Sequence, residues 1–266
     1  MTERIAWIGG NHTRHLYYVN NLVKKFNVVG GIVQEREDMK PIPPEGLDPI
    51  DDANWTRHFI ERENAENRYF DKQKLPNIKL LKVDKDTLND SDSADFMKSL
   101  KPDIVLIFGI GMIREPLINA LPKETINLHL GISPRYRGAA TLFWPFYFLE
   151  PNWAGVTFHY IVHSPDAGSI IHQTKPELYL SDGIHDVACR AVIKAAQDVS
   201  RLLKIHQENG CWEKFTQKPE AGKNFLESDF KPQYLRMIYN EYDNRIVNAY
   251  LNGDIKSKEP KLKKQF

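Results

Sequence analysis

Apolar residues recur along the chain in two patterns, as short continuous runs and as longer stretches in which they fall three or four positions apart. Runs of the first kind predict buried strands, and stretches of the second kind predict helices with one buried face. Strands are predicted at 4–8, 28–33, 78–83, 103–108, 124–129 and 156–162. Helices are predicted at 16–26, 51–71 and 91–100, and a fourth is capped by Ser181 or Asp182 and carries apolar residues as far as Leu202.

This alternation of strands and helices with short connections predicts βαβ units and a mostly parallel sheet. We therefore expect residues 1–205 to form one Rossmann-like α/β domain, with helices flanking the sheet. The proline-rich stretch 34–50 is expected to be a long loop, because proline cannot continue a helix or a central strand.

The composition shifts after Gly210, which predicts a small C-terminal extension at 206–266. It has a short polar strand candidate around 212–215, a tyrosine-rich stretch at 232–251 with helical character, and a basic tail expected to be frayed. We expect this extension to serve in dimerisation or in contacts with a substrate, so that the protein is a homodimer.

Charge and composition narrow the class of protein. The 36 Lys and Arg balance 35 Asp and Glu to a net charge of +1, which gives no broad attraction to nucleic acid or to a membrane surface. No window reaches the roughly 18 apolar residues of a membrane-spanning helix, and the N-terminus lacks the pattern of a signal peptide. Two cysteines cannot form a disulfide framework. We expect a cytoplasmic protein with no nucleic-acid or membrane partner.

Candidate chemistry gathers at the end of the strand predicted at 124–129. Asn127 and His129 are two positions apart, so both side chains project to one face at the carboxyl edge, where open α/β sheets bind ligands. Asp166 lies in the turn-rich segment 163–168, which can return a carboxylate to the imidazole. An amide, an imidazole and a carboxylate suit oxyanion stabilisation and proton transfer. The alternative that both segments are structural stays open.

Other patterns are weaker. His159 and His163, with His172 and His185 nearby, suggest zinc, yet spacing of four in an extended segment does not converge on one point, so no metal is expected. Gly9-Gly10-Asn11 before a helix is an incomplete phosphate cradle. No serine or cysteine occupies a nucleophile elbow, which favours direct transfer over a covalent intermediate.

Two segments together carry a family resemblance. INLHLGISPRYRGAATLFWPF (126–146), followed by SPDAGSIIHQ (164–173), resembles the folate-dependent formyltransferases, and Phe-Trp-Pro at 143–145 is similar to their sugar N-formyltransferase branch. The resemblance covers residues 1–205 firmly. It implies that Asn127, His129 and Asp166 are catalytic in direct formyl transfer from formyl-tetrahydrofolate to an amine. It also implies a folate cleft formed by Phe108, Gly109, Ile110, Gly111, Met112 and Ile113 together with Asp166 and Gly168.

The resemblance further implies that the acceptor is a nucleotide-linked amino sugar, as in cell-surface polysaccharide biosynthesis. Asn11 and Arg14, at a helix start, suit its pyrophosphate, and the remaining substrate-binding candidates are Arg137, Gly138 and Trp144. An ordinary helix start and an aromatic core cluster are the plain alternatives. Two further alternatives are an enzyme like methionyl-tRNA formyltransferase and a non-catalytic folate or nucleotide binder. Neither the sugar nor the nucleotide is indicated by any sequence feature.

Overall fold

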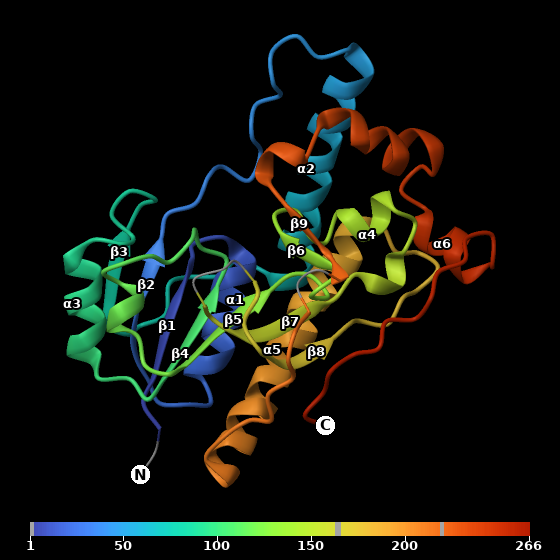
Figure 1. The fold of residues 1–266 in the computed structure, drawn as a ribbon. Coiled ribbons are helices and arrows are strands. Elements are labelled where there is room, and N and C mark those ends of the chain that lie inside the picture. The colour runs from blue at the N-terminus through green and yellow to red at the C-terminus, as the bar shows by residue number, and fades with distance from the viewer. Residues whose placement is uncertain (1–2, 163–165, 219–220) are drawn as a thin grey trace.

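A computed structural model describes residues 3–162, 166–218 and 221–266 and is built around one twisted sheet (Figure 1). Its seven strands lie in the order β3-β2-β1-β4-β5-β7-β8. The first five are parallel, whereas β7 and β8 are antiparallel to their neighbours. The strands are β1 (Ile5–Gly10), β2 (Val28–Gln34), β3 (Leu80–Val83), β4 (Ile104–Phe108), β5 (Glu124–His129), β7 (Val156–Tyr160) and β8 (Ile170–Thr174). The predicted α/β class with a mostly parallel sheet is confirmed.

Helices cover both faces of the sheet. Successive residues of β1 face opposite sides, so they pack against different helices. Trp7 packs with Leu16 of α1, and Ile8 packs with Met97 of α3. The α-helices of the described residues are α1 (Thr13–Val23), α2 (Pro49–Phe70), α3 (Ser91–Leu100), α4 (Trp144–Tyr147), α5 (Ile184–Asn209) and α6 (Ile246–Leu251). Helices α1, α2 and α5 contact one another. None of the helices in the described residues combines the length and apolar character needed to cross a bilayer.

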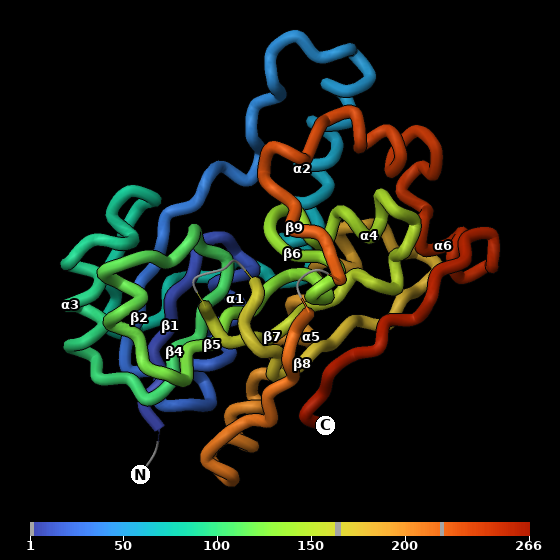
Figure 2. The backbone as a smooth tube through the Cα atoms, viewed as in Figure 1, coloured from blue at the N-terminus to red at the C-terminus, as the bar shows by residue number. Residues whose placement is uncertain are grey.

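The C-terminal extension folds back onto the rest of the chain (Figure 2). Its strand β9 (Lys223–Phe225) pairs with β6 (Tyr136–Gly138) in a second, two-stranded parallel sheet. Further along, the Arg236 guanidinium donates to the Asp51 carboxylate of α2 over 2.6 Å. Short 3-10 turns lie at Ile118–Ala120, Pro151–Trp153, Glu227–Asp229 and Pro232–Tyr234, and a π-helical turn lies at Met237–Glu241. The extension is therefore packed against both the sheet region and α2.

Several sequence expectations differ from this structure. The strand expected at 212–215 is only a single bridge between Phe215 and Ile170. The helical stretch expected at 232–251 is divided into a 3-10 turn, a π turn and α6. Strand β8 was not predicted. Its five residues, IIHQT, do not alternate between apolar and polar, so they carry no periodic signal of their own.

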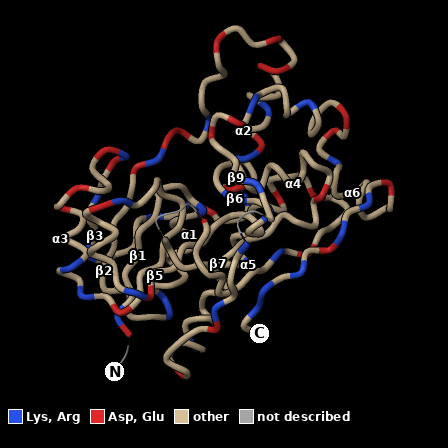
Figure 3. The backbone as a smooth tube through the Cα atoms, viewed as in Figure 1, with Lys and Arg blue, Asp and Glu red and all other residues tan. Residues whose placement is uncertain are grey.

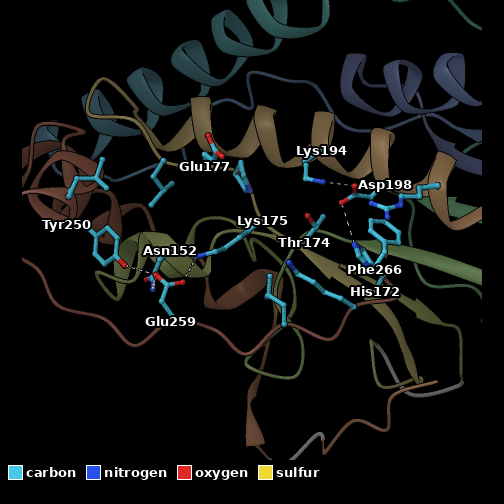
Figure 4. Close-up of a pocket in the computed structure, with 16 residues that line it drawn as sticks. Asn152, His172, Thr174, Lys175, Glu177, Lys194, Asp198, Tyr250, Glu259 and Phe266 are labelled. Atoms are coloured by element: carbon cyan, nitrogen blue, oxygen red, sulfur yellow. Dashed lines mark hydrogen bonds and ion pairs between the residues drawn. The ribbon is translucent and has the colours of Figure 1, made fainter. Parts of the chain in front are cut away.

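The basic tail was expected to be frayed, and this expectation is wrong. Gln173 of β8 donates its backbone N–H to the Lys263 carbonyl over 2.7 Å, and the Gln265 side chain donates to the Ile171 carbonyl over 2.8 Å. Phe266 stacks on His172 at 4.5 Å between ring centroids, beside a cavity of about 730 Å³ between α5 and the tail (Figure 4). The tail covers an edge strand that would otherwise expose unpaired backbone groups. Over most of the described chain Lys and Arg are interspersed with Asp and Glu, whereas the tail is mainly basic (Figure 3).

Candidate active site

The predicted pair lies at the carboxyl end of β5, which is flanked by β4 and by the antiparallel strand β7. The register places Asn127 opposite His159 and His129 opposite Thr157. His129 is buried and Asn127 is partly buried. The two side chains share one face of β5, as their spacing predicts.

Asp166 reaches this pair from the connection between β7 and β8. One carboxylate oxygen, Oδ2, lies 3.3 Å from His129 Nδ1 and accepts the Gly138 backbone N–H over 2.9 Å. The other oxygen, Oδ1, accepts from Asn127 Nδ2 over 3.4 Å. The structure thus brings Asn127, His129 and Asp166 together. His163, Ser164 and Pro165, which precede Asp166, lie outside the described residues.

His129 has a hydrogen-bond acceptor on each side of its ring. Its Nε2 lies 2.9 Å from the Tyr136 carbonyl oxygen, and its Nδ1 faces the Asp166 carboxylate. Two acceptors favour a ring that carries both protons. Burial opposes that charge and lowers the pKa of His129, the Asp166 carboxylate raises it, and the net pKa lies below the ordinary value. The imidazole is therefore held in one orientation, and its burial favours the neutral form.

The surroundings of Asp166 favour its ionised form. Burial raises the pKa of this carboxyl, but His129, His159 and the Gly138 N–H outweigh burial, so the pKa lies well below its usual range. Asp166 also has a backbone φ of 48°, in the left-handed region that aspartate tolerates better than most residues. A fixed negative charge therefore stands beside the imidazole.

A second histidine belongs to the cluster and was not predicted. His159 Nε2 lies 3.2 Å from Asp166 Oδ1 and 3.2 Å from Asn127 Nδ2, and its Nδ1 lies 2.9 Å from the Tyr160 carbonyl oxygen. In sequence it stands 32 residues from Asn127. Only the pairing of β5 with β7 makes the two residues neighbours, so strand spacing carries no signal for His159 beyond its place in an apolar strand.

The four polar residues form part of the wall of a cavity of about 990 Å³. The loop 108–113, predicted to hold a pterin, lines the same cavity. Gln34 Oε1 accepts the Gly111 N–H over 2.8 Å, and Asn89 donates to the Met112 carbonyl over 3.0 Å. Gly109 has a φ of 72°, and a Cβ there would meet the His15 ring at 2.0 Å. The loop is held in a defined shape that only glycine fits at this position.

A second arm of the cavity extends between α2, α5 and the extension. Its aromatic lining comes from three separate segments, as Trp55 packs on Phe59 at 4.8 Å and Phe143 packs on Phe230 at 4.8 Å. In the same cavity lining, Arg14 forms a 3.0 Å ion pair with the buried Glu66. The arm therefore combines flat apolar surface with a buried charged pair.

The substrate residues predicted from sequence are divided by the structure. Arg14 and Gly138 line the cavity, whereas Asn11, Arg137 and Trp144 are absent from its lining among the described residues. Gly168, predicted for the folate cleft, is likewise absent from this lining. Asn11 accepts the Arg36 backbone N–H over 3.0 Å. Trp144 stacks on Phe225 at 4.4 Å and donates to the Ala139 carbonyl, so its ring is part of the core. Binding roles for these residues stay predictions.

Comparison with known proteins bears on this site directly, because residues 51–203 match the model of the formyl transferase family. The chain belongs to the formyl transferase family. The matched range contains Asn127, His129, His159 and Asp166. Among the described residues, no group of three or more His, Cys, Asp or Glu side chains is placed to hold a metal ion.

Individual relatives of this chain are distant in sequence. The chain is 29% identical over 158 residues to methionyl-tRNA formyltransferase of Clostridioides difficile (strain 630), over 57% of this chain and 50% of that protein. It thus spans about half the length of that relative. The fold is similar to an N-formyltransferase from Helicobacter canadensis, solved with folinic acid and dTDP-3-aminofucose, with a TM-score of 0.55 and 17% identity over 93% of this chain and 81% of that one. It is also similar to phosphoribosylglycinamide formyltransferase from Anaplasma phagocytophilum, with a TM-score of 0.54 and 16% identity over 77% and 87%.

Proposed function

We propose that this protein transfers a formyl group from formyl-tetrahydrofolate to the amine of a nucleotide-linked amino sugar. The observation that carries the proposal is the convergence of Asn127, His129 and Asp166 on one cavity wall, beside the loop 108–113. A cavity of about 990 Å³ has room for both reactants side by side. The family membership supports the transfer of a formyl group, and the structure solved with folinic acid supports a reduced folate as donor.

The transfer begins with attack of the acceptor amine on the formyl carbon. Negative charge then develops on the formyl oxygen, where the Asn127 amide donates a hydrogen bond and the His129 imidazole stabilises the charge. Asp166 holds the imidazole in orientation and assists removal of a proton from the attacking amine. Collapse of the tetrahedral intermediate breaks the bond between the formyl carbon and the folate nitrogen, which gains a proton as it leaves.

The second arm of the cavity supports a nucleotide-linked acceptor. Trp55, Phe59 and Phe230 offer flat surfaces against which a base can pack, and Arg14 and Arg36 supply positive charge along the path to the catalytic residues. The N–H groups at the start of α1 complete a site for the diphosphate in this proposal, and Asn11 holds the Arg36 backbone beside it. The dTDP-linked amino sugar bound by the Helicobacter protein is the chemical precedent.

Transfer to methionyl-tRNA is the second candidate, because the curated relative from Clostridioides carries that name. The described extension folds back on the sheet and α2 instead of forming a separate RNA-binding unit. The near-zero net charge also offers little of the phosphate attraction on which RNA binding depends. These two features favour the nucleotide sugar.

A substrate panel tests the proposal. The protein is incubated with formyl-tetrahydrofolate and, separately, with a series of UDP- and dTDP-linked amino sugars, methionyl initiator tRNA and glycinamide ribonucleotide, and each acceptor is analysed by mass spectrometry. We expect one nucleotide sugar to gain a single formyl group, and we expect the Asn127→Ala protein to produce none above background. Formylation of the tRNA alone would overturn the proposal.

A further inference from the structure

The backbone that carries Asp166 lies outside any helix or strand, between the end of β7 at Tyr160 and the start of β8 at Ile170. All the carboxylate contacts described above are on the cavity side. Its left-handed φ of 48° is a conformation that L-residues other than glycine adopt only at an energetic cost. Something other than the reacting groups must therefore hold this turn.

One side chain contacts that turn from behind. Gln217 is buried, and its Nε2 donates to the Asp166 carbonyl over 3.0 Å and to the Gly168 carbonyl. A primary amide has two N–H donors, so one nitrogen can serve both carbonyls. The reversed amide would set an oxygen against two carbonyl oxygens, which fixes the orientation. Gln217 thus bridges the residues on either side of Ala167.

The segment that carries Gln217 is itself anchored at both ends. On one side, Phe215 and Ile170 exchange two backbone hydrogen bonds of 2.8 Å, directly at the start of β8. On the other side, Gly222 lies so close to the chain at Pro134 that a Cβ would meet its carbonyl oxygen at 1.6 Å, and β9 then pairs with β6. Strand β6 ends at Gly138, whose N–H binds the Asp166 carboxylate. The extension therefore supports Asp166 in two ways. The Gln217 side chain binds its backbone directly, and the pairing of β9 with β6 supports the Gly138 N–H that binds its carboxylate.

From these contacts we infer that Gln217 is a positioning residue, which holds Asp166 so that its carboxylate meets His129 and Asn127. The C-terminal extension thereby contributes to the geometry of the proposed catalytic site, in addition to the dimerisation expected from sequence. This inference rests on the proposed formyl transfer. It requires no contact between Gln217 and either substrate.

The test compares Gln217→Met, which keeps the length of the side chain without its donors, with Gln217→Glu, which places an oxygen against the two carbonyls. Gln207→Met, at an exposed position of α5, is the matched control. We expect kcat to fall roughly 10- to 100-fold in both Gln217 variants, because displacements of about 1 Å have effects of that size, while the KM for the acceptor stays near its wild-type value. The control should match wild type.

A second readout is independent of the acceptor. The titration of His129 is followed by 1H–15N NMR of its ring nitrogens, with Asp166→Asn as the reference for a lost carboxylate. Because Asp166 raises the pKa of His129, both Gln217 variants should lower that pKa in the same direction as Asp166→Asn. An unchanged His129 titration and unchanged kcat, even with a lower melting temperature, would show that Gln217 serves the fold alone and would overturn the inference. If no acceptor is formylated, the proposed function fails, and the NMR readout still decides whether Gln217 positions Asp166.

Discussion

Two groups of buried histidines line the same cavity and differ in what stands beside them. His129 and His159 each have a nitrogen within 3.3 Å of the Asp166 carboxylate. His15, His58 and His185 line the other arm. In the described part of the chain, no carboxylate lies within ion-pair distance of these three rings, whereas four other histidines have such a partner.

The presence or absence of a carboxylate divides the cavity into two ends. We call the end at Asp166 the reactive end, and the end lined by His15, His58 and His185 the binding end. Burial lowers the pKa of His58 to about 3. Burial, together with nearby positive charge that includes Arg14, holds the pKa of His15 and His185 well below the ordinary value. These rings are neutral at pH 7 and can only bind by hydrogen bonds or by packing. At the other end, a carboxylate opposes the effect of burial on His129. We therefore expect proton transfer at the Asp166 end, and this comparison can be tested at both ends of the cavity.

The largest effect is expected at the reactive end. Asn127→Ala, His129→Ala and Asp166→Ala should each lower kcat by at least ~100-fold, because the lost interactions act mainly in the transition state. Folate affinity, measured by fluorescence titration, should change little. His58→Gln, in the other group of histidines, is the control and should keep most of the wild-type kcat. A His129→Ala enzyme with near-normal turnover would remove the distinction between the two ends.

A smaller effect is expected in the loop 108–113, which is predicted to line the folate cleft. Gly109→Ala introduces a side chain at a φ of 72° and against the His15 ring, so we expect the Kd for the folate to rise roughly 10-fold. Gly111→Ala is the matched control, since a Cβ there meets its nearest atom at 3.6 Å, an ordinary contact. Equal affinities in the two variants would argue against a folate site at this loop.

At the binding end, Arg14→Ala should raise the KM for the nucleotide sugar about 10-fold without altering the Kd of the folate, since a hydrogen bond to a charged group contributes about 1.5 kcal/mol or more. Arg14 shares Glu66 with Arg62, so the variant leaves that buried carboxylate one partner. Arg68→Ala, an exposed arginine of the same region, serves as control. A change in folate affinity instead of acceptor KM would assign Arg14 to the donor.

The smallest effect concerns stability and pH. His58 is neutral in the folded protein down to about pH 3 but becomes protonated near pH 6.5 once unfolded. The unfolded state then binds more protons, so this contribution is complete above pH 6.5 and is lost by about 1.4 kcal/mol per pH unit as the pH falls below that value. Urea unfolding at pH 7.5 and 5.5 should show a smaller difference in His58→Phe than in wild type. Tyr239→Phe removes the same 3.0 Å hydrogen bond but keeps the imidazole, so it should retain the wild-type pH dependence.

The sequence by itself determined most of the strands and helices, together with the part of the site that lies on a single strand. Strands and helices could be assigned because the apolar period is a local property, and Asn127 and His129 share a face because side chains alternate along any strand. The mostly parallel sheet followed from the short connections between strands and helices. The resemblance across 126–146 and 164–173 then indicated Asp166 as their partner.

Only the tertiary structure decided which distant segments meet. His159 joins the cluster because β5 and β7 pair in one register, and Gln217 reaches Asp166 because Phe215 bridges to Ile170 and β9 pairs with β6. The basic tail is ordered because β8 offers it an open edge. Each of these contacts joins backbone groups far apart in the chain, whose hydrogen bonds satisfy buried donors and acceptors without requiring any particular local pattern of side chains. A local pattern therefore cannot encode them, and the residues around Asp166 come together only after the sheet and its extension have assembled.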